Sequence, residues 1–386
     1  MISEPDDVVR RATRALTSGL FGVALVTGLS LRVSQLRPDG LTSYEVYNAI
    51  FSAHGAALFA LLPAVVSRFS LQRAGTPSAL NWLALLAVGL IVPGTILAGL
   101  LDWPTDAAFP QPIFVVPLLL VAIIVAIQAL VGVRASRWSA GSLALAGAGL
   151  LLVPAVVGSL ASVLPQALAL AGLALLVDDP TRRGTFGADQ LLVAVLLLAA
   201  VLNALSGAWS ILAGTASLVA SGWLSIRVAR LALRGSDSLP FAGYSVLCAA
   251  MFFEGVVATQ LLALLSAQEH MGGTTFVTGA FHFKVCTVVL AALALDGRPA
   301  VVATRPARTF WWLESTLVAL GTQVFCGGLL LLGARGQPSR YFKYLPEFQE
   351  LHVAVTAASI SLALGLALAF VRRSRDARVR ARAALP

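Results

Sequence analysis

Apolar positions in this chain form long runs that are separated by short polar or arginine-bearing segments. A helix needs about 20 consecutive apolar residues to cross the hydrocarbon core of a bilayer. Most of the runs have about this length, so the pattern predicts an all-α, polytopic membrane helical bundle. We expect about twelve transmembrane helices, at residues 17–35, 44–67, 79–101, 112–133, 140–157, 159–177, 188–207, 209–232, 243–266, 275–295, 309–332 and 350–371.

The composition supports a membrane location. Hydrophobic residues make up 58% of the 386 residues and charged residues only 12%, whereas soluble domains contain about 25% charged residues. We therefore expect a single transmembrane domain over residues 1–386, with a short N-terminus at 1–16, the bundle at 17–371 and a basic tail at 372–386. The three cysteines lack CxxC and CxxCH spacing, which favours packed thiols over disulfides, zinc or covalent haem.

The distribution of basic residues predicts the orientation of the chain. An even number of spans places both termini on one side of the membrane. Of the 27 lysines and arginines, 21 fall on that side, five fall on the opposite side, and Lys284 lies within a span. The positive-inside rule therefore predicts cytoplasmic termini in a bacterial-type plasma membrane. The net charge of +9 then indicates topology and contact with anionic lipid of the bilayer, and not nucleic-acid binding.

Two of the four histidines, His54 and His282, lie inside predicted spans. Both spans start at the predicted outer face, and the histidines follow the span starts by about ten and about seven residues. At a rise of 1.5 Å per residue, both imidazoles lie about 10–15 Å deep. A lone intramembrane histidine is explained by a hydrogen bond to a neighbouring helix, but two at one depth favour a haem iron held between them. Cationic donors for its propionates are available in the outer loop that carries Arg340 and Tyr341.

Other polar residues have simpler explanations. Glu254 and Lys284 lie near mid-depth in neighbouring spans, so we expect a buried ion pair. Glu314 lies closer to the cytoplasmic face and can extend toward it, although a proton or quinone role is an alternative for all three residues. His270 and His352 are expected at the surface or rim rather than as ligands.

Four stretches resemble subunit I of the haem-copper oxidases, the twelve-helix core of cytochrome c oxidase. Residues 47–55 (YNAIFSAHG) resemble its second helix, and residues 31–32 and 37–40 resemble the end of its first helix and the following loop. Residues 280–283 (AFHF) resemble the His-Phe-His-Tyr signature of the tenth helix, and residues 337–348 resemble the propionate-binding outer loop. The resemblance implies that His54 and His282 ligate the low-spin haem iron. It also implies haem contacts for Arg340, Tyr341 and Arg32, the last near a formyl group if the haem carries one. Trp103, in the outer loop at 102–111, is a further candidate for the propionates, and an interfacial anchor is the ordinary alternative for it.

The departures from this family concern its oxygen-reducing centre. The proximal ligand of the second haem corresponds to Ala280, and the copper ligand and tyrosine of the sixth helix correspond to Leu164 and Leu168. The histidine pair of the seventh helix has no counterpart, because residues 183–269 contain no histidine. Without these ligands no metal is available to bind and split oxygen. We therefore expect one low-spin haem, with haem b as the default, and no copper.

These observations predict a membrane cytochrome subunit that transfers electrons within a respiratory-type complex and does not itself reduce oxygen. Its expected partners are other subunits of a membrane redox complex and a periplasmic cytochrome or a quinol. The alternative is a non-redox scaffold, assembly factor or transporter that reuses the oxidase fold, with Glu254, Lys284 and Glu314 along a solute or proton path. A working oxidase or nitric oxide reductase is disfavoured by the missing ligands.

Overall fold

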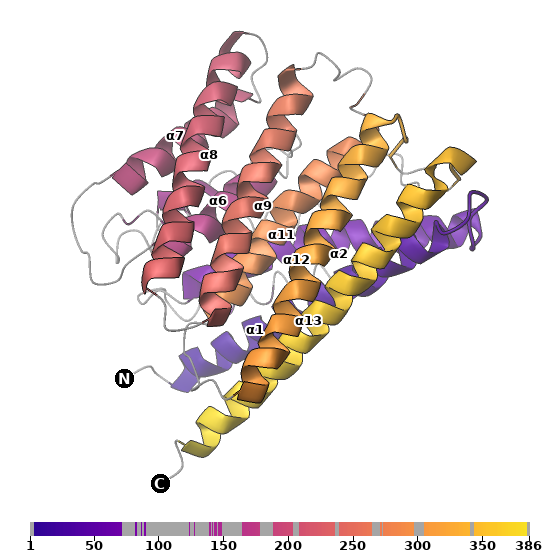
Figure 1. Ribbon diagram of the computed structural model, residues 1–386. Helices are drawn as coiled ribbons and strands as arrows, with labels where there is room; N and C mark the ends of the chain where they lie inside the picture. The colour runs from indigo at the N-terminus through magenta and orange to yellow at the C-terminus, as the bar shows by residue number, and fades with distance from the viewer. Residues whose placement is uncertain are drawn as a thin grey trace.

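The computed structural model describes residues 4–71, 164–177, 188–203, 208–235, 239–264, 273–296, 305–339 and 343–383, with a few isolated positions between 82 and 148 and at 271. These residues form a bundle of long helices (Figure 1). The helices are α1 (Glu4–Ser34), α2 (Tyr44–Leu71), α6 (Leu164–Val177), α7 (Ala188–Asn203), α8 (Ala208–Gly235), α9 (Leu239–Leu264), α11 (Thr275–Asp296), α12 (Arg305–Ala334) and α13 (Gln349–Ala383), with a 3-10 turn η2 (Pro346–Phe348) before α13.

The helices coincide with the apolar runs. Every predicted span that falls on described residues contains a helix, and α11 begins at the predicted residue. Six of the described helices are long and apolar enough to cross a membrane, which shows an all-helical, multi-pass membrane protein. Helices α6 and α7 have only 14 and 16 residues in the described part of the chain. The spans predicted at 79–101, 112–133 and 140–157 lie outside the described residues, apart from isolated positions.

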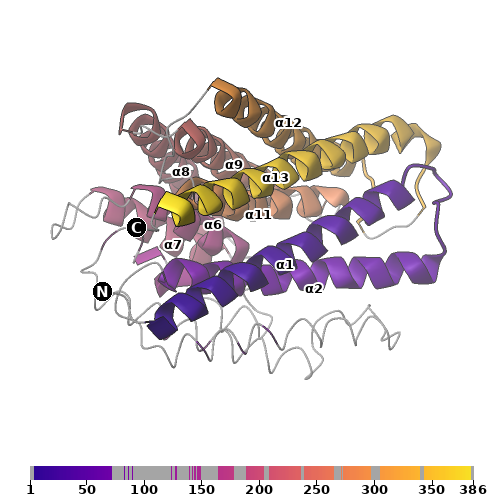
Figure 2. The same ribbon diagram turned by 90° about the horizontal axis from the view of Figure 1, so that it is seen from below.

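Both termini lie at the same end of the bundle, as Figures 1 and 2 show. We call this the terminal end, and we call the opposite end, where residues 35–43, 273–274, 335–339 and 343–348 lie, the loop end. The turn from α1 to α2 at the loop end uses Gly40, whose φ of 78° is easily adopted only by glycine. Ser43 then caps α2, because its Oγ accepts a hydrogen bond from the Val46 amide at 3.4 Å. These local signals set the register of α2 and thereby the depth of His54.

Backbone contacts tie the loop-end segments together. The Tyr344 amide donates to the Pro38 carbonyl at 3.2 Å, and the Ser339 amide donates to the Gly273 carbonyl at 2.7 Å. Thr274 and Pro338 form an isolated antiparallel bridge. The starts of α2, α11 and α13 are therefore held at a common level, so residues at similar distances along these helices face one another.

Helix α11 is the most enclosed of the six candidate spans, because 67% of the residues in its most apolar stretch are buried inside the bundle. It contacts α2, α6, α9 and α12. Since lipid tails are as apolar as leucine, helix association in a membrane depends on close packing of small residues. Helices α12 and α13, adjacent in Figures 1 and 2, show this. A Cβ on Gly321 would come within 2.5 Å of the Leu362 amide nitrogen, and one on Gly365 within 2.8 Å of that of Val318.

Candidate functional site

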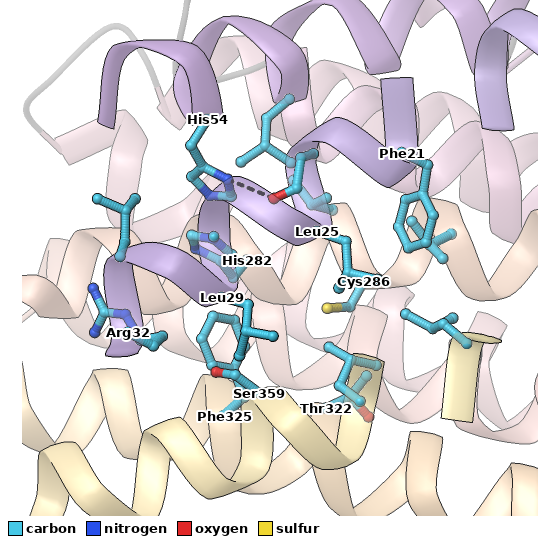
Figure 3. A pocket seen from close by; sticks show the side chains of 18 of the residues that line it. Phe21, Leu25, Leu29, Arg32, His54, His282, Cys286, Thr322, Phe325 and Ser359 are labelled. Atoms are coloured by element: carbon cyan, nitrogen blue, oxygen red, sulfur yellow. Dashed lines mark hydrogen bonds between the residues drawn. The ribbon is translucent and has the colours of Figure 1, made fainter. Parts of the chain in front are cut away.

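A deep pocket lies between α1, α2, α11, α12 and α13 (Figure 3). It contains about 950 Å³ of atom-free space, a figure that includes the open space at its mouth. Its walls consist mainly of leucine, valine, alanine and phenylalanine side chains. Such a lining fits a large apolar ligand that carries few polar groups. The polar or sulfur-bearing side chains that line it are Arg32, His54, His282, Cys286, Thr322 and Ser359.

His54 of α2 and His282 of α11 point toward one another across this pocket (Figure 3). Their ring centroids are 6.0 Å apart and their planes differ by only 10°. The sequence expectation that the two imidazoles meet at one level is thereby confirmed. Phe325 of α12 contacts the His282 ring edge-on at 5.2 Å and fixes it from a third helix.

Each imidazole is oriented by one backbone carbonyl. Nδ1 of His54 lies 2.8 Å from the Ala24 carbonyl oxygen, and Nδ1 of His282 lies 2.7 Å from the Thr278 carbonyl oxygen. A carbonyl only accepts, so both Nδ1 atoms must carry the proton. Both Nε2 atoms are therefore unprotonated, and neither has a hydrogen-bond partner among the described residues. This is the state of a metal-binding histidine, in which the second ring nitrogen donates to a carbonyl.

Gly28 of α1 provides the space for the His54 ring. A Cβ at position 28 would lie 2.8 Å from His54 Cε1 and 3.1 Å from Nδ1. A Cβ closer than 3.0 Å to another heavy atom is not tolerated, so the His54 ring or the backbone of α1 would have to move. The ring is thus held between the Ala24 carbonyl and the bare backbone of Gly28, one helical turn apart on the same face of α1.

The spacing of the rings agrees with a metal ion between them. A metal–imidazole bond is about 2.0–2.1 Å, and each nitrogen lies about 1.1 Å from its ring centroid, so two opposed ligands have centroids about 6.2 Å apart. Stacked aromatic rings reach similar separations of about 4.5–7 Å. The separation therefore fits either arrangement. Neither Nε2 atom is hydrogen-bonded among the described residues and both rings line the pocket, so both lone pairs are available to a ligand.

Of the other predicted site residues, Arg32 lines the pocket near the loop end. Its Nη1 is buried and has no hydrogen-bond partner in the described part of the chain. Trp103, Arg340 and Tyr341 lie outside the described residues.

The expected position of His352 was wrong. Its side chain is 1% exposed, because Tyr344 from the preceding segment covers it, with ring centroids 3.9 Å apart. A periodic signal for this burial existed in the sequence: Thr356 and Ser359 follow His352 at helical spacing, and all three are buried. Sequence analysis also missed Gly28, for which no pattern in the chain gives a signal.

The expected ion pair between Lys284 and Glu254 is not formed within the structure's described residues. The Glu254 carboxylate accepts a hydrogen bond from Gln323 Nε2 of α12 at 3.3 Å. Lys284 instead packs against Gly255, where a Cβ would lie 3.6 Å from Lys284 Cγ. Adjacent residues on a helix point about 100° apart, so Glu254 faces α12 while its neighbour faces Lys284. Lys284 is 7% exposed, which excludes a lipid-facing position.

Glu314 is fully buried and does not extend to the aqueous face. Its carboxylate accepts bidentate hydrogen bonds from Arg372 of α13, with Nε 2.8 Å from Oε2 and Nη2 2.9 Å from Oε1. Tyr244 of α9 also donates to Oε1 at 2.5 Å. This group joins α9, α12 and α13 toward the terminal end, and it lies apart from the pocket lining.

Ala280 and Leu168, two positions at which the sequence departs from the oxidase pattern that it resembles, are packed among apolar side chains. Ala280 is buried in a cluster with Ala258 and Phe276, and Leu168 is 1% exposed in the main core. Within the described residues, no group of three or more histidine, cysteine, aspartate or glutamate side chains is arranged to hold a metal. The chemistry available to the described site is therefore that of two opposed imidazoles in an apolar pocket.

No protein-family model and no curated protein matches this chain.

Proposed function

We propose that this protein is a membrane cytochrome subunit that binds one low-spin haem through Nε2 of His54 and Nε2 of His282. The observation that carries the proposal is the opposed pair of imidazoles, whose ring centroids are 6.0 Å apart. Both Nδ1 atoms are bonded to carbonyls, and neither Nε2 atom has a hydrogen-bond partner among the described residues. The donor set fits haem iron, since imidazole suits iron and the surrounding walls suit a porphyrin. The resemblance of residues 47–55, 280–283 and 337–348 to haem-copper oxidase subunit I supports the same ligand pair.

A bound haem would supply one-electron redox chemistry, and the chain's residues would tune it. The Ala24 and Thr278 carbonyls fix the tautomer and orientation of the ligands and increase their basicity. The apolar walls exclude water, so the pocket itself contributes little to stabilising the extra positive charge of an oxidised haem iron. Two axial histidines leave no open position for oxygen, which suits electron transfer rather than oxygen reduction.

The partners follow from the position of the site. His54 and His282 lie nearer the loop end of their helices, which the charge distribution predicts to be the outer side. A single haem at that depth exchanges electrons with a periplasmic cytochrome or a quinol at the bilayer edge. Electron transfer across the whole membrane would require further redox centres, so we place the protein in a larger membrane redox complex.

The test is a reduced-minus-oxidised absorption spectrum of protein purified from haem-replete cells. Wild-type protein should show the sharp α-band of low-spin haem at one haem per chain. His54→Gly and His282→Gly should each lose this band, because one axial position opens. Added imidazole should restore the band in both variants by occupying the vacated position.

The outcomes separate ligand loss from unfolding. A Cys248→Ala variant serves as the control, because it shortens a buried side chain that does not line the pocket, and it should retain the six-coordinate band. A colourless wild-type preparation, or a low-spin band that survives both glycine substitutions, would refute the proposal and favour the non-redox alternative.

A further inference from the structure

The loop end next to the pocket contains several buried polar atoms that lack hydrogen-bond partners among the described residues. They include Nη1 of Arg32, both ring nitrogens of His352 and the hydroxyl of Tyr344. His352 is 1% exposed and Tyr344 is 8% exposed. Buried polar atoms are nearly always hydrogen-bonded, and each unpaired one costs free energy comparable to its desolvation. Three such side chains in one region indicate that a ligand completes them.

The three side chains belong to segments that the fold holds together. Thr356 Oγ1 of α13 donates to the Arg32 carbonyl of α1 at 3.2 Å. His352 lies one turn before Thr356 on the same face of α13, and it stacks on Tyr344. Tyr344 is in turn anchored to the α1–α2 turn through the Pro38 carbonyl.

This cluster is continuous with the pocket. Arg32 lines the pocket, as does Ser359, which lies two turns beyond His352 on the same face of α13. Apart from Arg32, the two histidines, Cys286, Thr322 and Ser359, the pocket lining is apolar. A ligand that fills both parts must be amphiphilic, with a large apolar body and a polar group at the loop end.

The polar group must be an anion. The described ion pairs join Arg227 to Asp189 and Arg372 to Glu314, and neither involves Arg32. A buried guanidinium without a counter-charge is strongly unfavourable, and a guanidinium binds a carboxylate with two parallel hydrogen bonds. A neutral imidazole provides one further N–H donor.

We propose that Arg32 and His352 form a carboxylate-binding subsite that holds the propionate side of the haem, with Tyr344 as a third donor. This inference rests on the proposed function, because the haem supplies the carboxylates. In this proposal the Arg32 guanidinium binds a propionate carboxylate of the haem, and His352 donates a hydrogen bond to the same side of the haem.

The test compares two porphyrins that differ only at the carboxylates. Apo-protein from haem-deficient cells is titrated in detergent with protohaem and with protohaem dimethyl ester, in which both carboxylates are methylated and uncharged. Wild-type protein should bind protohaem about ten- to hundredfold more tightly, from the strength of hydrogen bonds to charged groups. Both porphyrins should give a low-spin spectrum, because His54 and His282 bind the iron in each case.

The variants locate the preference. Arg32→Gln combined with His352→Leu should reduce protohaem affinity to that of the ester and abolish the preference. The matched control is Arg37→Gln, which removes an exposed arginine from the nearby α1–α2 turn and should leave the preference unchanged. The wild-type comparison needs no variant, so the inference stays testable even if the double variant does not fold.

Each outcome decides one question. Equal affinity of wild-type protein for the two porphyrins would overturn the carboxylate subsite and leave the haem proposal intact. Failure of both porphyrins to give a low-spin spectrum would overturn the proposed function itself. Binding of oleate to apo-protein as tightly as protohaem would assign the cluster to a lipid carboxylate and would also overturn the inference.

Discussion

Replacing Gly28 by alanine should disturb the proposed haem site, although residue 28 would provide no ligand. The added Cβ would lie 2.8 Å from His54 Cε1, whereas ordinary contacts begin at 3.4 Å. The His54 ring must therefore move by about 0.6 Å, the difference between these two distances. Metal sites require their ligands within about 0.5 Å of the productive geometry, so this displacement is large enough to weaken the iron–nitrogen bond.

The displacement also affects the hydrogen bond that orients the ring. The Ala24 carbonyl, 2.8 Å from His54 Nδ1, lies one turn from Gly28 on the same helix. A ring pushed away from α1 must lengthen this bond. Loss of such a supporting interaction typically lowers metal affinity about 10- to 100-fold. We expect Gly28→Ala to lower haem affinity by at least about tenfold and to convert part of the six-coordinate haem to a high-spin form.

The assay is haem titration of apo-protein, followed by the reduced-minus-oxidised spectrum. Gly22→Ala is the matched control, since it is the same substitution in α1 and a Cβ there meets nothing within 4 Å. Both variants replace a helical glycine and gain similar helix propensity, about 1 kcal/mol. Unchanged affinity and spectrum in Gly28→Ala, or equal losses in both variants, would refute the argument that space at position 28 positions the His54 ring.

Two further predictions test the packing around the site. Arg372→Leu leaves the fully buried Glu314 carboxylate without its cation and should destabilise the fold by about 3–5 kcal/mol. The double variant with Glu314→Gln should recover much of the loss in thermal unfolding in detergent, and an equal loss in it would contradict a charge-based cause. Cys286 and Cys326 have their sulfurs 3.9 Å apart, so copper-phenanthroline oxidation should link them, as detected by mass spectrometry of digested protein. The linkage should persist in Cys248→Ser, and a disulfide involving Cys248 would contradict the α11–α12 packing.

Some errors of the sequence analysis have a common physical origin. The hydrophobic period gives the depth of a residue and the face of the helix that it occupies, but it does not give the partner across the interface. Glu254 and Lys284 were paired because they share a depth, yet Gly255 is the residue that faces the lysine. Glu314 instead pairs with Arg372, 58 positions away, because α12 and α13 approach closely through glycine.

The sequence by itself determined the helices and the depth of the imidazoles. Runs of apolar residues long enough to cross a bilayer specify helix, since backbone groups in lipid must be satisfied within the segment. The turn at Gly40 and the cap at Ser43 then fix where α2 begins, and so the level of His54. The level of His282 follows in the same way from the start of α11 at Thr275.

Only the tertiary structure decided how these residues meet. The rotation of each helix about its axis depends on small residues such as Gly28, whose missing side chain admits the His54 ring. The same packing gives each Nδ1 a carbonyl partner, and among the described residues it leaves both Nε2 atoms, Nη1 of Arg32 and the ring nitrogens of His352 without hydrogen bonds. Close approach between helices is a property of two surfaces at once, and for that reason the pattern along one chain segment does not contain it.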